Sequence, residues 1–392
     1  MNASRHAAVS ASITYALLLT GQGVYLPFFP LWLAWRGFNA EEIGMLLAIP
    51  MFMRVVASAP LARIGDGSLG PRRTFLIMVC GSAFAYAALP VSPDFLTVAL
   101  ALGVATAFLA PTAPLLDVIV LDGVSMHGHD YGRIRQWGSL AWLLASLAAG
   151  SLFGHLPIAA VPPILALLSA VTVFAGLTLP DDRRGTGRHR AETRGGTAPD
   201  PLQFAVFTAG LACLQGAHAF LYSFATLIWQ HAGFNSLDIG AFWAVGVVTE
   251  TGLFLLGGNL AAALGPWRMI FIGAAAGLIR WICLGFEPKS GLAIAALQSM
   301  HGLSFAIIHL ATIHWLSRYE RGRAARQGLV ASIIGAGLTA GTVAAGQLYA
   351  HFGGGGYFVM AIVCTIGGGL IVVAAQLSAR PTPAPYPPSS ET

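Results

Sequence analysis

Charged residues are scarce in this chain, and their scarcity excludes a water-soluble fold. Only 9% of the 392 residues are charged, whereas 56% are hydrophobic. Soluble domains typically carry about 25% charged residues, so this chain cannot cover a surface that faces water. The apolar residues also gather in runs of about 20, which is the length that spans the ~30 Å hydrocarbon core of a bilayer. The sequence therefore predicts an all-α membrane protein.

Cysteine is sparse as well, and its spacing excludes the common metal and disulfide frameworks. The four cysteines occur in four different apolar runs, without CxxC spacing or clustered histidines: Cys80, Cys213, Cys283 and Cys364. We expect them to be small buried hydrophobic groups, with no metal and no cofactor. A membrane enzyme would need a catalytic cluster at one membrane face, and the sequence contains none. We therefore expect a protein that is not an enzyme.

The apolar runs predict twelve membrane-spanning helices. The first run is too long for the ~7–15-residue core of a cleavable signal peptide, so we expect it to remain as the first helix. The predicted spans are 9–34, 42–62, 74–91, 95–122, 134–154, 157–179, 203–230, 238–262, 268–286, 291–316, 327–351 and 356–378. They define two six-helix bundles, 1–180 and 202–379, which are joined by a polar linker at 181–201. The proline-rich tail, 380–392, is predicted to be disordered.

The basic residues set the expected orientation in the membrane. The linker, the two chain ends and the loops after even-numbered spans hold seventeen of the 21 Lys and Arg residues, whereas the opposite loops hold only Arg36 and Lys289. Because basic loops stay on the cytoplasmic side, both termini and the linker are predicted to be cytoplasmic in a cell inner membrane. The net charge of +5 follows from this orientation. It requires no nucleic-acid partner.

An internal repeat predicts the architecture. Three short segments recur at offsets of 196, 195 and 196 residues: GFN at 37–39 and 233–235, LGP at 69–71 and 264–266, and AAG at 148–150 and 344–346. Six spans separate the copies, so the two halves have the same orientation. Two parallel six-helix repeats are typical of the major facilitator fold, in which a small-molecule site lies between the halves near the bilayer midplane.

Three ionisable residues are predicted to lie near that midplane. Arg54, Glu250 and Arg280 each follow their helix start by about twelve residues, or ~18 Å. A charge at this depth costs about 2.5–3.5 kcal/mol and indicates a functional site. Arg54 and Glu250 are also equivalent at the offset of 196, so we expect both to face a central cavity. The alternative for Arg54 and Glu250 is a salt bridge that only holds the two halves together. The alternative for Arg280 is that it only pairs with Glu250 inside one bundle.

Glu250 is the candidate proton carrier. Burial and a nearby Arg280 would act on its proton affinity in opposite directions, so that affinity could change with the exposure of the site. Gln298 and His301 are three residues apart on one helix face and are candidates for substrate or proton contact. His218 is a further candidate for substrate binding. For both histidines, packing inside the bundle is the alternative.

The fourth and fifth spans carry candidate gate residues. Asp117 follows two prolines that are expected to bend its helix, and Arg133 and Arg135 begin the next helix. We expect ion pairs among these residues that close the cytoplasmic side in one conformation. Ordinary charges at the membrane edge are the alternative.

Several segments carry a resemblance to a known family. They are PFFPLWL at 27–33, PLLD at 114–117, YGRIRQWGS at 131–139, GVVTE at 246–250, RW at 280–281 and LQSMHG at 297–302. The chain resembles the proton-coupled branch of the major facilitator superfamily that contains the 3-phenylpropionate permease. Nucleoside proton symporters and lactose permease are more distant relatives.

The resemblance implies roles for particular residues. A Glu, an Arg and a His on helices eight, nine and ten serve proton coupling and sugar binding in lactose permease, and they look like Glu250, Arg280 and His301 here. In the loop after the second span Asp66 matches the superfamily pattern and is implied in gating, although Gly67 stands where a basic residue is usual. Phe305 stands where lactose permease has an acidic residue, so sugar specificity is not implied.

These observations together predict a secondary active transporter. The leading hypothesis is uptake of an aromatic carboxylate, such as a phenylpropionate-like acid, by proton symport. Arg54 and Arg280 can bind a carboxylate, and aromatic side chains can stack on a ring. Symport of a nucleoside or sugar, drug efflux, and a transporter-derived sensor are the alternatives. The expected partners are the solute, protons and the lipid bilayer, and the protein is expected to act as a monomer.

Overall fold

The computed structural model describes residues 2–127, 130–180, 198–319 and 323–378. Most of the predicted linker, 181–201, and the whole predicted tail, 380–392, lie outside these ranges. Within them the chain is helical and has no strand. The fold class predicted from the apolar runs is therefore confirmed.

The described helices cover all twelve predicted spans. In chain order they are α1 (Asn2–Trp35), α2 (Ala40–Val56) with α3 (Ser58–Ala62) and η1 (Arg63–Asp66), α4 (Gly70–Ala88), α5 (Phe95–Leu109) with α6 (Thr112–His127), α7 (Tyr131–Leu152), α8 (Val161–Gly176), α9 (Pro201–Gly216) with α10 (Ala219–His231), α11 (Ser236–Gly285), α12 (Gly291–Ser299) with the π segment η4 (Gly302–Ala306) and α13 (Ile307–Leu316), α14 (Arg323–Phe352) and α15 (Gly356–Ser378). Two predicted spans form the single element α11, which is broken by non-helical geometry at Gly265.

Length and apolar composition alone identify fewer spans among the described residues. Nine helices qualify, or ten when the bent pair Ala40–Val56 and Ser58–Asp66 is counted as one span. One of the nine, Ala325–Ser378, contains both α14 and α15, which are separate helices on either side of Gly353. The helix α7, which has Arg133 and Arg135 among its first five residues, is not among the nine. Separating α14 from α15 and adding α7 gives twelve.

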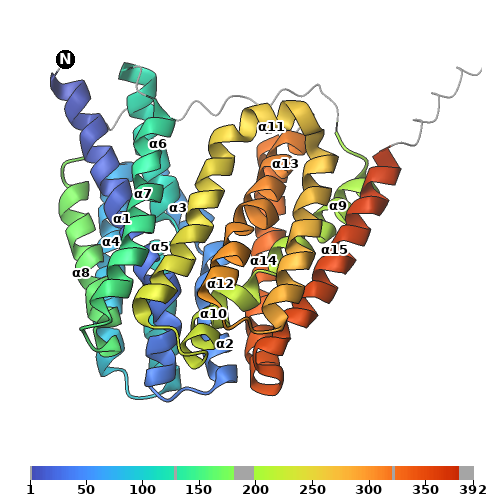
Figure 1. The fold of residues 1–392 in the computed structure, drawn as a ribbon. Helices are drawn as coiled ribbons and strands as arrows, with labels where there is room; N and C mark the ends of the chain where they lie inside the picture. The colour runs from blue at the N-terminus through green and yellow to red at the C-terminus, as the bar shows by residue number, and fades with distance from the viewer. Residues whose placement is uncertain (1, 128–129, 181–197, 320–322, 379–392) are drawn as a thin grey trace, which may run out of the picture.

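The helices form two groups that lie side by side (Figure 1). In the first helix group, α1–α8, α1 packs on α7 and α8, and α4 packs on α5. In the second helix group, α9–α15, α15 packs on α9 and α11, and α14 packs on α9. We call the side on which α1 begins and α15 ends the terminus side, and the opposite side the far side.

The sequence repeat is also a repeat of backbone geometry. Gly37 and Gly233, which are 196 residues apart, have left-handed φ angles of 85° and 93°. Gly70 and Gly265, which are 195 residues apart, have φ angles of 74° and 68°. Residues with a Cβ rarely adopt these angles, so glycine is needed at equivalent turns of both groups.

The repeat extends to helix capping. The Asn39 side chain accepts a hydrogen bond of 2.9 Å from the Glu42 backbone N–H at the start of α2. The equivalent Asn235 accepts one of 3.0 Å from Asp238 at the start of α11. Each cap satisfies an N–H that the helix itself leaves without a partner.

Removing either cap should destabilise the protein modestly. Asn39→Ala is expected to lower the free energy of unfolding by about 1 kcal/mol, and Asn235→Ala by a similar amount. Thermal unfolding of the purified protein in detergent measures the effect. Asn39→Ser keeps a capping oxygen and is the matched control. Equal losses in the alanine and serine variants would show that capping is not the cause.

The two groups meet closely on the far side through a symmetric pair of glycine contacts. A Cβ added to Gly44 would lie 2.7 Å from Gly346 Cα, and one added to Gly240 would lie 3.2 Å from Gly150 Cα and 2.4 Å from the Ser146 carbonyl oxygen. The offset of 196 relates Gly44 to Gly240 and Gly150 to Gly346. The α2–α14 and α7–α11 contacts are therefore copies of one another, and both are backbone against backbone.

The hydrophobic core shows the same division between the two sides. One core cluster includes buried residues from both helix groups, among them Trp142 and Phe220. A second cluster, which includes Tyr15, Phe75 and Leu116, belongs to the first helix group alone. The groups are thus joined by close contacts on the far side, while the first helix group has a core of its own near the terminus side.

Candidate functional site

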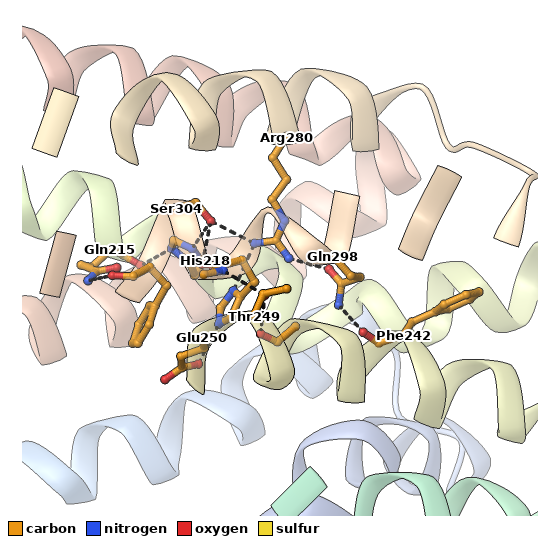
Figure 2. A network of polar contacts seen from close by, with 12 residues as sticks. Gln215, His218, Phe242, Thr249, Glu250, Arg280, Gln298 and Ser304 are labelled. Atoms are coloured by element: carbon orange, nitrogen blue, oxygen red, sulfur yellow. Dashed lines mark hydrogen bonds and ion pairs between the residues drawn. The ribbon is translucent and has the colours of Figure 1, made fainter. Parts of the chain in front are cut away.

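Arg280 is the centre of a buried polar network in the second helix group (Figure 2). Its side chain is 0% exposed. One guanidinium nitrogen donates to His301 Nδ1 and to Ser304 Oγ, both at 3.2 Å, and the other donates to Gln298 Oε1 at 2.5 Å. The Gln298 amide in turn donates to the Phe242 carbonyl at 3.2 Å. Among the described residues no carboxylate forms an ion pair with Arg280.

His301 connects this network to Glu250. A guanidinium can only donate hydrogen bonds, so His301 Nδ1 must accept and a neutral ring must carry its hydrogen on Nε2. The Nε2 atom lies 3.4 Å from Glu250 Oε2. The sequence predicted Arg280 near Glu250 and left a direct pair inside one bundle as the alternative; in the structure His301 lies between them.

Glu250 is the accessible end of this chain of groups. Its side chain is 25% exposed, in contrast to the fully buried Arg280. Figure 2 shows its carboxylate pointing away from Arg280, toward the pale blue ribbon of the first helix group. A solute or water molecule between the two groups could therefore reach Glu250.

The π segment η4 brings the Glu250 and His301 helices close together. The Gly302 backbone N–H donates to Thr249 Oγ1 at 3.4 Å. A Cβ on Gly302 would lie only 2.7 Å from the Thr249 carbonyl oxygen, so any larger residue would push η4 away from α11. Single π turns inside helices are frequent at functional sites. This one begins directly after His301.

His218 lies beside the network but inside the helix group. It is buried, and its Nε2 atom lies 3.3 Å from Ser304 Oγ, while its Nδ1 atom lies 3.3 Å from the Gln215 carbonyl. Its ring packs edge-on against Trp281 with centroids 4.9 Å apart. His218 therefore contacts Ser304, which binds Arg280, and its role in substrate binding stays a prediction.

Arg54 is an exposed cation on α2 of the first helix group. Within the described ranges no hydrogen bond or ion pair involves its guanidinium. Its charge interacts with the hydroxyl group of Tyr222, which lies on α10 of the second helix group. The Tyr222 ring is 6.2 Å from the His301 ring, so Arg54 faces the region of the buried network. The salt bridge to Glu250 that symmetry suggested as an alternative is not formed in this structure.

The candidate gate residue Asp117 is held inside the first helix group. Tyr15 and Tyr131 both donate hydrogen bonds to its Oδ1 atom, the latter at 2.7 Å. Arg135 lies 3.8 Å from the same oxygen, and its guanidinium stacks over the Tyr15 ring at 5.8 Å. The predicted Asp117–Arg135 pair is thus present, but it joins α6 to α7 and does not bridge the two groups in this conformation.

The remaining predicted gate residues are exposed. Arg133 pairs with Asp130, three residues earlier, at 3.6 Å. Asp66 ends η1 and forms no ion pair with the residues that the structure describes. Within those residues there is also no group of three His, Cys, Asp or Glu side chains that could hold a metal ion. A gating role for Asp66, Asp117, Arg133 and Arg135 stays a prediction.

Sequence reasoning did not find several members of the site, and Tyr15, which donates to Asp117, had no signal in the sequence. Ser304 follows His301 by three residues, and Tyr222 follows His218 by four, so helical spacing to a candidate histidine was the available signal. Tyr131 lies inside the YGRIRQWGS segment, next to the predicted gate arginines.

Comparison with known proteins identifies the family. A sequence model described as "MFS_1 like family" matches residues 8–360. The chain belongs to the MFS_1-like family. As a member of this family of the major facilitator superfamily it is a multi-pass membrane transporter, not an enzyme, as the sequence predicted.

Individual MFS proteins are similar along nearly their whole length. The "Probable 3-phenylpropionic acid transporter" of Escherichia coli (strain K12) is 29% identical over 359 residues, which is 90% of this chain and 94% of the relative. The "Maltose permease" of Geobacillus stearothermophilus is 22% identical over 92% of each chain. These relatives indicate that an MFS transporter of this kind carries a small molecule.

Solved structures confirm the MFS fold. The nucleoside transporter NupG has a TM-score of 0.78 at 18% identity, with 97% of this chain and 100% of NupG covered. A bacterial homologue of the human lysosomal transporter Spinster, solved in an inward-facing and unoccupied conformation, has a TM-score of 0.75 at 14% identity, with 97% and 99% covered. The two-group arrangement of Figure 1 is thus an MFS fold.

Proposed function

We propose that this MFS transporter takes up a small aromatic carboxylate by proton-coupled symport, with alternating access of a site between the two helix groups. The observation that carries the proposal is Arg54. It is an exposed guanidinium in the membrane-spanning part of α2, and it has no anionic partner among the described residues. An uncompensated cation at this depth is costly, and a carboxylate that it binds through paired hydrogen bonds would relieve that cost.

The aromatic part of the proposed solute is supported by the residues around the buried network. Tyr222 interacts electrostatically with Arg54, and its ring is 6.2 Å from His301 and 6.3 Å from Trp243. Phe305 stacks on His301 with ring centroids 5.2 Å apart. These rings are already in contact with one another, and the half-buried Tyr222 and Phe305 offer an aromatic surface on which the ring of a solute can stack. The similarity to a probable 3-phenylpropionic acid transporter supports the same solute class.

Proton coupling is supported by the chain of groups Arg280–His301–Glu250. Among the described residues no carboxylate forms an ion pair with Arg280, so its charge favours an anion nearby, and Glu250 is the carboxylate that His301 connects to it. A solute anion that binds at Arg54, next to Tyr222, would also act on Glu250 through its charge. Solute binding and proton binding at Glu250 would therefore be linked, as symport requires.

The orientation that we propose follows the basic loops. The terminus side carries the arginine-rich loops, so we assign it to the cytoplasm and the protein to the cell inner membrane. In the described conformation the glycine contacts close the far side. We further propose that residues 1–180 and 202–379 move as two bundles about the linker 181–201, and that a monomer is sufficient for transport.

Purified protein in proteoliposomes tests the proposed function. A proton gradient should drive accumulation of labelled 3-phenylpropionate and similar aromatic acids, and dissipating the gradient with a protonophore should stop it. Maltose and uridine, tested in the same vesicles, are the competing solutes. Accumulation of either in place of the acids, or outward pumping of the acid, would contradict the proposal. If the protein binds the ligand but transports none of the solutes, a transporter-derived sensor would be favoured.

Arg54 should control affinity for the acid. Arg54→Gln removes the charge and the paired donors, so we expect the KM for the carboxylate to rise at least about tenfold, which corresponds to ~1.4 kcal/mol or more for a charge-assisted hydrogen bond. Arg54→Lys keeps the charge and should lose less. The corresponding aromatic alcohol, which has no carboxylate, should be unaffected by either change. An unchanged KM in Arg54→Gln would show that the carboxylate binds elsewhere.

A further inference from the structure

A proton that leaves Glu250 cannot pass to His301 while Arg280 stays in place. A neutral histidine accepts a proton only at its bare nitrogen, which in His301 is Nδ1. That atom already accepts a hydrogen bond of 3.2 Å from the Arg280 guanidinium. The nitrogen that faces Glu250, Nε2, already carries a hydrogen. His301 can orient Glu250, therefore, but another group must take the proton.

His309 lies on the path from Glu250 to the terminus side. It follows His301 by eight residues, or ~12 Å along the helix, and α12–α13 run toward the terminus side. Its ring contacts Phe254 with centroids 6.0 Å apart, and Phe254 is one helical turn beyond Glu250 on α11. His309 is thus the next titratable group beyond Glu250 along these two facing helices.

The surroundings of His309 fit a group that exchanges protons. Its side chain is exposed, whereas His301 is buried, and within the described ranges no hydrogen bond or ion pair fixes it. Its charge and that of Glu250 interact. The other groups against its ring, Phe254 and Phe305, are uncharged, and the Phe305 ring is parallel to it to within 2°. Glu250 is therefore the charged group that acts on His309.

We propose that His309 takes the proton from Glu250 and releases it on the terminus side. The Glu250 O–H bond breaks, a water molecule carries the proton, and an N–H bond forms on the imidazole. The imidazolium is stabilised by the carboxylate left behind and then gives its proton to the solution. Histidine suits this role because it gains and loses protons near neutral pH. The inference rests on the proposed proton coupling and adds the group that completes the release.

The test compares two transport modes in proteoliposomes. Net uptake driven by the proton gradient requires proton release, whereas exchange of labelled for unlabelled acid does not, because the loaded carrier returns with its proton. His309→Asn should lower net uptake by about 10²-fold, the lower end of what loss of a positioned proton-transfer group produces, and leave exchange unchanged. Imidazole added on the terminus side should restore part of net uptake. His314→Asn, on the same helix, is the matched control and should behave as wild type.

The outcomes distinguish failure of the proposed relay, which is proton transfer from Glu250 to His309, from failure of proton coupling at Glu250. Net uptake by His309→Asn and His309→Gln that equals wild type would overturn the relay. Equal losses of uptake and exchange, without rescue by imidazole, would also overturn it, since they indicate a packing role for the ring. Glu250→Gln is measured alongside. If Glu250→Gln stops accumulation while His309→Asn does not, only the relay fails, and if Glu250→Gln accumulates normally, the proposed coupling fails.

Discussion

Glu250→Gln is expected to stop accumulation of the solute against its gradient while exchange of labelled for unlabelled solute continues. Glutamine keeps the size of the side chain and an oxygen that can stay beside His301 Nε2, which lies 3.4 Å from the carboxylate. It cannot bind or release a proton, so the carrier would stay in a form that resembles protonated Glu250. Net uptake should fall by about 10² or more, as for loss of a positioned proton-transfer group.

Two further variants show whether the loss of accumulation in Glu250→Gln is due to loss of the Glu250 carboxylate. Glu250→Asp keeps the carboxylate but withdraws it from His301 by one methylene, so it should retain coupling at a reduced rate. Glu41→Gln removes a carboxylate of the same size at the start of α2 and is the control that should behave as wild type. The initial rate and steady-state level of uptake, with and without a protonophore, are the measurements. Undiminished accumulation by Glu250→Gln would show that another group couples transport to protons.

Hydropathy predicted the helices well, because membrane insertion depends on long apolar runs that can be counted directly. It could not predict where the helices break. The prolines before Asp117 signalled the bend between α5 and α6, but the breaks near Ala57 and Ala217 have no proline at the break itself. Such breaks depend on packing against other helices, which a single sequence does not record. The predicted loop at 263–267 is present as a short kink at Gly265, where the two spans of α11 meet.

The sequence could predict which residues form the candidate site, but not which of them contact one another. Depth in the membrane and charge pointed to Glu250, Arg280 and His301, because ionisable groups there are rare and costly. The order in which they contact one another depends on how each helix is rotated, and the π segment after His301 changes that rotation locally. The sequence therefore could not show whether Glu250 contacts Arg280 directly or, as in the structure, through His301. It also gave no sign that the Asp117–Arg135 pair would lie within one helix group.

The glycine contacts on the far side should be as important for transport as the charged groups. Gly44 meets Gly346, and the equivalent Gly240 meets Gly150, at distances that leave no space for a Cβ. A leucine at Gly44 or Gly240 would separate the two helix groups there, so the far side could no longer close. Overpacking of this kind typically costs about 1–3 kcal/mol, or about 10–10²-fold in the population of the closed form. The two contacts lie on different helix pairs, so their effects should add in free energy.

Gly44→Leu/Gly240→Leu is therefore expected to lower net uptake by about 10²–10⁴-fold, and exchange should fall with it, because both modes require the far side to close. This joint loss distinguishes the double variant from Glu250→Gln, in which exchange continues. The distance between spin labels at the far-side ends of α2 and α14 should increase at the same time. Gly369→Leu is the matched control, since a Cβ there would have no atom within 4 Å. Normal transport by the double variant would mean that the two groups need not approach this closely during the cycle, and the glycine pairs would then be a feature of packing alone.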